Sequence, residues 1–315
     1  MGIISLKKRL IILRGLAIAY LGIGGLLWWG QQRLLFWPSP VLERTQSKYN
    51  LDYEDVWLPV SDPEGNVERI HGWWLPASQP QAPVLLYLHH NAVNIGANVS
   101  QAKSFHKLVF SVLLIDYRGF GLSEGDFPDE FQVYRDAEVA WHYLTQKRGI
   151  PPQQIFIYGH SLGGAIAIYL AVRHPEAGAL IAHNSFTNLR DMTKRFGIFW
   201  LFPVDLLLRQ KFDSIGKISG LKMPVLFIHG TRDPQIPARM SESLLATAPA
   251  PKRLLLIPEG HDNNMDKEYW QEVGKFMQQV QSDNNKATMS PGNSMSPGRS
   301  MFPGKHRSRT KDIAN

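Results

Sequence analysis

One serine in this chain stands where its hydroxyl could act as a nucleophile. Ser161 lies in the run Gly159-His160-Ser161-Leu162-Gly163, which follows the apolar run IFIY and precedes the helical pattern LGGAIAIYLAVRH. Small residues two positions before and after the serine allow a sharp turn that exposes Oγ. The N–H of Leu162, at the start of the helix, would point toward an oxyanion formed there. A G-x-S-x-G match alone is a weak signal, and its position between a strand and a helix makes it a strong one.

A serine hydroxyl at neutral pH is a poor nucleophile, so it needs a base, and the base needs an acid to orient it. In serine hydrolases built on a parallel sheet, the order along the chain is serine, acid, histidine, each on a loop after a strand. Asp233 follows the apolar run VLFIHG, and His261 follows RLLLIP. We therefore predict that Ser161 is the nucleophile, Asp233 the orienting acid and His261 the general base.

The elements that would position these residues are short apolar runs separated by amphipathic stretches such as 131–148 and 241–248. The runs are continuous rather than alternating, which is typical of strands buried on both faces of a parallel sheet. They are VLLYLHH (84–90), VLLIDY (112–117), IFIYGH (155–160), ALIAHNS (179–185), VLFIHG (225–230) and RLLLIP (253–258). Segments 56–60 and 68–76 predict an antiparallel edge. The pattern indicates an α/β fold of the α/β-hydrolase type, a mostly parallel twisted sheet with helices on both faces.

Several motifs together give the chain a family resemblance over residues 35–280. They are Leu88-His89-His90-Asn91-Ala92 with Asn94, the run from Asp116 to Ser123, Gly159 to Gly164, Gly230 with Asp233, and Gly260-His261-Asp262. In these the chain resembles the bud-emergence (BEM)-type α/β-hydrolases, a branch with serine aminopeptidase-like signatures. The resemblance implies hydrolysis of an ester or thioester through an acyl-enzyme, with no cofactor and no metal. It also implies a second oxyanion N–H from the loop after the histidine pair, at Asn91.

The chain departs from the family where its relatives carry His-Gly and it has His89-His90. A glycine there would permit a backbone conformation that is unfavourable for a residue with a β-carbon, so the departure bears on the loop that carries Asn91. Two other polar groups look catalytic in isolation. We interpret Asp116 and Arg118 as groups that fix a loop, and His160 as a packing residue that the turn directs away from the Ser161 hydroxyl.

Residues 10–30 form an apolar run of 21 positions with one charge, Arg14. At about 1.5 Å per residue this length crosses a hydrocarbon core of roughly 30 Å, and Trp28 and Trp29 are typical of an interfacial aromatic belt. The alternatives are a cleaved signal peptide, for which the small-x-small site is missing, and a buried core helix, which the basic flanks disfavour. We predict that residues 1–33 are a single-pass membrane anchor. A slight excess of Lys and Arg before the run predicts a cytoplasmic N-terminus and an extracytoplasmic hydrolase domain.

The rest of the chain divides into a hydrolase domain, 34–280, and a tail, 281–315, whose three Met-x-Pro-Gly copies predict a disordered basic segment. The net charge of +7 resides in the two ends, because residues 34–280 hold 23 basic and 25 acidic residues. A basic groove for nucleic acid is therefore not expected. The chain has no cysteine, which excludes a thiol nucleophile, disulfides and Cys–metal sites.

An apolar insertion within about 186–222 predicts a short cap over the active site, with some of residues 195–212 lining a pocket for an acyl group. Beside a membrane anchor, the expected substrate is an acylated small molecule, a lipid or an acylated protein. The leading prediction is a serine hydrolase that cleaves an acyl ester or thioester. Two alternatives stay open: a serine aminopeptidase-like peptide hydrolase, and a catalytically silent scaffold tethered to the membrane.

Overall fold

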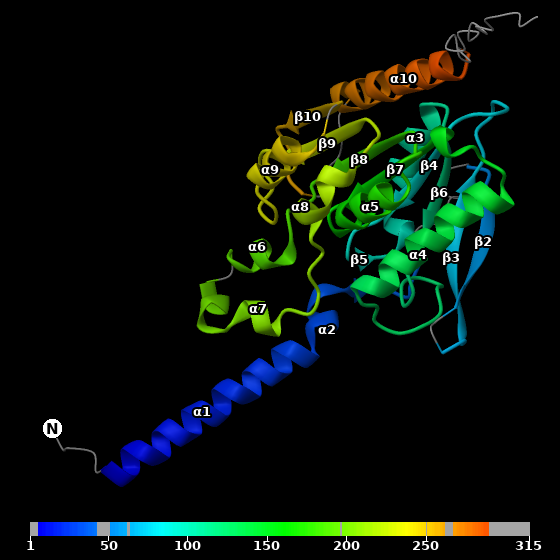
Figure 1. Cartoon of the computed structure of the whole chain (residues 1–315). Helices are drawn as coiled ribbons and strands as arrows, with labels where there is room; N and C mark the ends of the chain where they lie inside the picture. The colour runs from blue at the N-terminus through cyan, green and yellow to red at the C-terminus, as the bar shows by residue number, and fades with distance from the viewer. Residues whose placement is uncertain are drawn as a thin grey trace, which may run out of the picture.

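An eight-stranded sheet forms the centre of the molecule (Figure 1). The computed structural model describes residues 6–42, 51–61, 64–195, 197–249, 251–261 and 267–289. The strand order is β10-β9-β8-β7-β4-β6-β3-β2, and β1 and β5 make a separate pair. The strands are β1 (Trp37–Pro38), β2 (Glu54–Ser61), β3 (Val67–Leu75), β4 (Val84–Leu88), β5 (Ala92–Val93), β6 (Ser111–Ile115), β7 (Ile155–His160), β8 (Ala179–His183), β9 (Val225–Gly230) and β10 (Lys252–Ile257). Each of the six predicted apolar runs coincides with one strand of the sheet, with the start of the strand within one residue of the start of the run.

The strand directions agree with the sequence-based prediction. The strands from β6 through β4, β7, β8 and β9 to β10 pair in parallel, whereas β2 and β3 are antiparallel to their neighbours and form the predicted edge. One expectation was wrong. β10 was predicted to be buried on both faces, but it is the other edge strand, and most of its residues are partly or fully exposed.

Helices cover both faces of the sheet, which confirms the predicted α/β-hydrolase architecture. One buried cluster contains residues of α4, α5 and α9, and the other contains residues of α3 and α10. The helices of the domain are α3 (Val99–Lys107), α4 (Glu130–His142), α5 (Leu162–Arg173), α8 (Ser214–Lys217), α9 (Arg239–Thr247) and α10 (Lys267–Met289), with shorter turns η2 (Ile95–Asn98), η3 (Tyr143–Lys147), η4 (Pro152–Gln154) and η6 (Ile218–Gly220). α5 is buried almost along its whole length, because it packs against the sheet behind the predicted nucleophile.

The connection between β8 and β9 contains the segment predicted to cap the active site, about 186–222. Its first part contains α6 (Leu189–Thr193), η5 (Gly197–Leu201) and α7 (Val204–Leu207). In Figure 1, α6 and α7 lie below the sheet, on the same side as the point where the N-terminal helix joins the domain. We call residues 189–210 the cap.

The N-terminal helix α1 (Leu6–Trp29) projects from the domain as a stalk, and the short helix α2 (Gln31–Leu35) joins it to the domain (Figure 1). Of its residues only Gly24 is buried. By length and composition α1 is long and apolar enough to cross a membrane. A core helix of a soluble protein would bury its apolar side chains, and α1 leaves them exposed.

The cap packs directly against the end of this stalk. The Tyr20 hydroxyl donates to the carbonyl of Leu201 at 2.8 Å, and the Tyr20 ring stacks on Phe202 with ring centroids 5.0 Å apart. Gln31 makes three further hydrogen bonds: its Nε2 donates to the Leu207 carbonyl at 2.6 Å, and its Oε1 accepts from the N–H groups of Arg209 and Gln210. A single side chain of the anchor region therefore fixes the end of the cap.

The boundary predicted at residue 280 was wrong, because α10 continues to Met289. Its amphipathic pattern runs past Val280, which packs in the core. From the start of α10 onward the first proline, which would stop the helix, is Pro291. Residues 290–315, which hold most of the Met-x-Pro-Gly repeats, lie outside the described residues.

The Gln31 contacts predict that the cap loosens in a Gln31→Ala variant. Three hydrogen bonds to cap backbone groups are lost, and at about 1 kcal/mol each or less we expect trypsin to cleave within the cap at least about fivefold faster. The cleavage sites available there include Arg195 and Arg209. Gln32→Ala, the same change one residue along α2, is the control. Equal cleavage rates in the two variants would show that Gln31 does not hold the cap.

Candidate active site

Ser161 lies at a sharp turn between β7 and α5. Its φ of 55° and ψ of −118° put it in a region that residues with a β-carbon rarely adopt. The turn leaves no room at the two flanking glycines: a Cβ on Gly159 would lie 2.0 Å from the Gly163 carbonyl oxygen, and one on Gly163 would lie 2.1 Å from the carbonyl oxygen of Leu88. The Ser161 N–H is fixed by a 2.8 Å hydrogen bond to the His183 carbonyl of β8. The predicted requirement for small residues thus has a steric cause in the structure.

The structure brings the three predicted side chains together in one relay. His261 Nε2 lies 3.0 Å from Ser161 Oγ, and His261 Nδ1 lies 2.6 Å from Asp233 Oδ2. Ser161 and His261 are buried, and so is the Asp233 carboxylate. In the tautomer that donates Nδ1–H to Asp233, the other ring nitrogen can accept the proton of Ser161 Oγ. The arrangement has the geometry of a nucleophile, a base and an orienting acid.

Asp233 occupies the loop after β9, at the carboxyl end of the strand. Its Oδ1 accepts hydrogen bonds from the N–H groups of Gln235 and Ile236 at 2.7 and 2.9 Å. Burial opposes ionisation of this carboxyl, but the hydrogen bonds from His261 and the two N–H groups outweigh it, and its pKa lies below the usual range. The carboxylate is therefore charged at neutral pH and can balance an imidazolium at His261.

Two buried side chains hold the backbone of His261. Asn184 Nδ2 donates to the His261 carbonyl at 2.8 Å, while its Oδ1 accepts from the N–H of Gly230. His160 Nε2 lies 3.1 Å from the same carbonyl, and its ring lies against the His261 ring. Burial keeps the pKa of His160 well below its ordinary value, so the ring is neutral and acts as a positioning group, not as a base. The sequence reading missed Asn184, because only the fold brings the end of β8 to residue 261.

The two predicted oxyanion donors stand on adjoining segments. Leu162 is the first residue of α5, so its N–H has no acceptor within the helix. Gly163 touches the carbonyls of Leu88 and His89, which places the start of α5 directly against the loop that carries Asn91. Within the described part of the chain, no acceptor is found for the Asn91 N–H. Both N–H groups are therefore available for the predicted role.

His90 is accommodated without backbone strain. Among the described residues, positive φ in this loop occurs at Val93 (58°) and not at His90, so the missing glycine does not force an unfavourable conformation. His90 Nδ1 accepts a hydrogen bond from the Ala92 N–H at 3.2 Å, and its ring packs edge-on against His160. Burial, with the nearby His89 and His261 rings, lowers the pKa of His90 to about 3, so the ring is a neutral acceptor that closes the loop.

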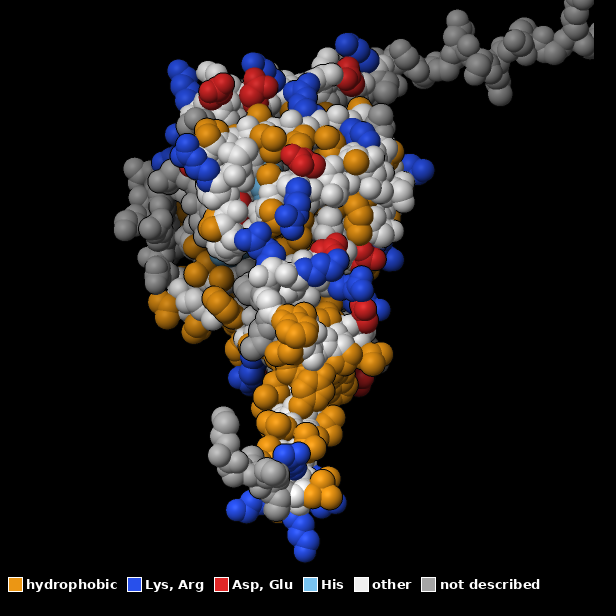
Figure 2. Space-filling view, turned by 90° about the vertical axis from the view of Figure 1, so that its left-hand side faces the viewer, with side chains coloured by type: hydrophobic (Ala, Val, Ile, Leu, Met, Phe, Trp, Pro, Cys, Tyr) orange, Lys and Arg blue, Asp and Glu red, His pale blue; other side chains and the backbone are white. Residues whose placement is uncertain are grey.

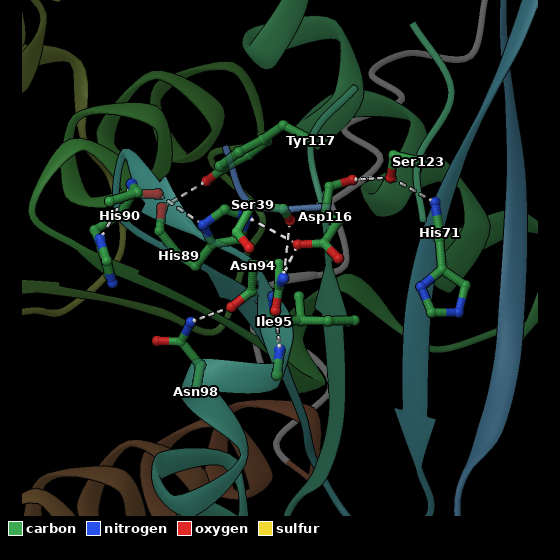
Figure 3. A network of polar contacts seen from close by, with 12 residues as sticks. Ser39, His71, His89, His90, Asn94, Ile95, Asn98, Asp116, Tyr117 and Ser123 are labelled. Atoms are coloured by element: carbon green, nitrogen blue, oxygen red, sulfur yellow. Dashed lines mark hydrogen bonds and ion pairs between the residues drawn. The ribbon is translucent and has the colours of Figure 1, made fainter. Parts of the chain in front are cut away.

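A network of buried polar groups holds the loop that carries Asn91 in place (Figure 3). Asp116 Oδ1 accepts from the Ile95 N–H at 2.8 Å, and the Tyr117 hydroxyl donates to the His89 carbonyl. Asn94 donates to the carbonyls of Ser39 and Val41. These contacts agree with the interpretation of Asp116 as a loop-fixing group.

Arg118 is equally structural. Its guanidinium pairs with the buried carboxylate of Asp136, at 2.7 Å from Nη2, and with Glu68. Glu68 belongs to β3 and Asp136 to α4, so neither partner of Arg118 is part of the relay at Ser161.

The segment that follows the anchor pairs with the predicted oxyanion loop, a contact that the sequence did not suggest. β1 and β5 run in parallel, with Trp37 opposite Ala92. The Trp37 N–H donates to the Asn91 carbonyl at 2.8 Å, and Asn91 Nδ2 donates to the Leu35 carbonyl at 2.5 Å. The anchor therefore continues, through hydrogen bonds, into the loop beside the nucleophile.

Among the described residues no group of three or more His, Asp or Glu side chains is arranged to hold a metal ion.

The His90 ring predicts a pH dependence of stability. Its pKa is about 3 in the folded chain and about 6.5 when unfolded, so the unfolded state binds the proton first and the folded state loses stability as the pH falls below about 6.5. Between pH 7 and pH 5, the unchanged chain should lose about 2 kcal/mol more unfolding free energy than a His90→Asn variant. Urea denaturation in mild detergent measures both.

An internal control is available at higher pH. Between pH 8 and pH 9 the imidazole is neutral in both states, so the difference between the two chains should stay constant. Equal losses between pH 7 and pH 5 would mean that the His90 ring titrates alike in the folded and unfolded chains.

Comparisons with known proteins identify relatives of this chain. Residues 79–210 match the protein family described as serine aminopeptidase, S33. The chain is 34% identical over 263 residues to an uncharacterised protein of Mycobacterium tuberculosis, covering 82% of this chain and 91% of that protein. It is 31% identical over 282 residues to the protein bem46 of Schizosaccharomyces pombe, covering 83% of this chain and 90% of that protein.

A solved structure shares the fold. An esterase of Pyrococcus furiosus superposes with a TM-score of 0.65 at 18% identity, covering 78% of this chain and 98% of that one. The relatives that are more than 30% identical over most of both chains establish the family. The chain belongs to the bem46-type α/β-hydrolases.

Proposed function

We propose that the chain is a membrane-anchored serine hydrolase that cleaves an acyl ester or thioester. The observation that carries the proposal is the relay from Asp233 through His261 to Ser161, with contacts of 2.6 and 3.0 Å, at the tip of a strained turn. A strained conformation held at a nucleophile is typical of a functional site.

In the proposed reaction His261 Nε2 takes the proton of Ser161 Oγ as the oxygen attacks the substrate carbonyl. The N–H groups of Leu162 and Asn91 stabilise the negative charge on the carbonyl oxygen. The imidazolium, balanced by Asp233, gives its proton to the leaving alcohol or thiol, and an acyl-enzyme remains on Ser161. A water molecule then attacks the acyl carbonyl, His261 takes its proton and returns it to Ser161, and the acid is released.

An ester or thioester is favoured over an amide by the apolar cap, which offers an acyl chain more contacts than a peptide backbone. The fold similarity to the Pyrococcus furiosus esterase is compatible with this substrate class. The second candidate is peptide hydrolysis, and the match of residues 79–210 to the serine aminopeptidase family favours it. The contacts of Tyr20 with Leu201 and Phe202 of the cap support an anchor over a cleaved signal peptide, because cleavage would remove Tyr20 and leave both cap residues without this partner.

Labelling by a fluorophosphonate probe tests the serine nucleophile. The unchanged full-length chain should be labelled, and Ser161→Ala should lose all labelling, because no other hydroxyl lies in the relay. Ser185→Ala, a change at the buried serine that follows β8, is a matched control and should keep its label. A folded chain that is not labelled would favour the silent-scaffold alternative.

The same preparation separates the two enzyme candidates. Chromogenic p-nitrophenyl esters should be hydrolysed at least about a hundredfold faster than aminoacyl p-nitroanilides. The reverse order would replace the esterase proposal with the peptidase one.

The proposed orientation places the N-terminus in the cytoplasm and the hydrolase domain outside it. Four basic residues stand before or within the apolar run, against three after it, a slight excess: Lys7, Lys8, Arg9 and Arg14 against Arg33, Arg44 and Lys48. Protease added to intact cells should therefore digest the domain and leave α1 in the membrane. Digestion only after the cells are opened would reverse the orientation.

A further inference from the structure

A cavity of about 300 Å³ lies between the anchor and the cap. One wall comes from α1 and α2, through Leu27, Leu34 and Leu35, and the facing wall comes from the cap, through residues such as Met192, Phe202 and Leu207. Ten of its fourteen lining residues are apolar. The cavity is therefore suited to a hydrocarbon and offers little to a charged or strongly polar ligand.

The inner end of the cavity meets the predicted oxyanion loop, because Asn91 is one of the lining residues. The same Asn91 is tied to Leu35 by its side chain and to Trp37 by its carbonyl. A chain lying in the cavity would thus reach the loop that carries Asn91, one of the two predicted oxyanion donors.

The outer part of the cap lies beside a section of α1 that belongs in the hydrocarbon. Leu201 and Phe202 contact Tyr20, which is nine residues, or about 13 Å along the helix, before Trp29. Trp200 and Leu206 are each 80% exposed, although large apolar side chains in contact with water are costly. Figure 2 shows hydrophobic side chains covering the stalk up to the base of the domain, with Lys and Arg side chains beyond both ends of this band.

We propose that the cavity receives the long acyl chain of a substrate directly from the bilayer, with the anchor helix as one wall of the substrate site. The inference rests on the proposed function and names its substrate class: a membrane-embedded long-chain acyl ester or thioester. The cap enters the outer part of the same leaflet as the end of α1, and the acyl chain passes between them to Ser161 without crossing water.

Two pairs of adjacent leucines provide matched variants. Leu27 and Leu207 line the cavity, whereas their neighbours Leu26 and Leu206 are exposed. In Leu27→Trp and Leu207→Trp the larger ring fills the cavity, and we expect the ratio of kcat/KM for p-nitrophenyl palmitate to that for p-nitrophenyl acetate to fall tenfold or more. In Leu26→Trp and Leu206→Trp the ratio should stay within twofold of that of the unchanged chain.

Fluorophosphonate labelling of each variant shows that its relay is intact, and Leu27→Phe provides a milder filling where the Trp variant is not labelled. An unchanged ratio in labelled cavity variants, or an equal fall in the exposed-leucine controls, overturns the inference and leaves the proposed function standing. An unchanged chain that is neither labelled nor active on the acetate ester overturns both.

The route from the bilayer is tested with the full chain reconstituted in phosphatidylcholine vesicles. p-Nitrophenyl palmitate placed in the same vesicles should be hydrolysed at least tenfold faster than the same ester supplied in separate vesicles, while the soluble acetate ester is hydrolysed equally in both arrangements. Equal rates for the palmitate ester would show that the chain enters from water and would overturn the proposal.

Discussion

The left-handed backbone at Ser161 is a conformation that a serine holds only when its surroundings fix it on every side. Such a residue costs about 1–3 kcal/mol, which here is offset by neighbours that have no room to move. β8 binds the Ser161 N–H, Gly159 touches Gly163, and Gly163 touches the end of β4. These contacts join β7, β8, β4 and α5 at one point. Because all four belong to the buried core, the turn is as rigid as the sheet, and the hydroxyl points where the loops after β9 and β10 can meet it.

The loops that meet Ser161 are held by buried polar groups. Asn184 and His160 bind the backbone of His261. Tyr117 binds the His89 carbonyl before the predicted oxyanion donor Asn91, and Asp116 binds the Ile95 N–H after it. A buried hydrogen-bonded group costs much to disturb, because its partner is left unsatisfied. The substitution of His for Gly at position 90 fits this scheme, since the neutral ring supplies an acceptor to the Ala92 N–H and packs on His160.

The N-terminal helix is joined to the predicted site by hydrogen bonds as well as by the chain itself. β1 extends from α2 along the predicted oxyanion loop, and Gln31 binds the cap. Gln31 and Asn91 of this loop both line the apolar cavity, so that a shift of α1 would move the cavity wall and the loop together. In a chain that crosses the bilayer, this connects the position of the membrane to the shape of the site through backbone hydrogen bonds.

Local sequence patterns determine much of this structure. The six parallel strands, the antiparallel edge, the turn at Ser161 and the apolar N-terminal helix are each decided by neighbouring residues. The order of Ser161, Asp233 and His261 along the chain was sufficient to predict the contacts that the structure assembles. The exposure of β10 and the extension of α10 to Met289 were not predictable in this way, because both depend on what packs alongside.

The roles of Asn184 and Gln31 were also not predictable from local sequence. Asn184 binds a backbone group 77 positions away, and Gln31 binds one 176 positions away. Neither residue stands in a motif. Local sequence determined which chemistry this chain could perform, and the tertiary structure decided which side chains hold that chemistry in place, because hydrogen bonds between distant segments exist only after the sheet has brought them together.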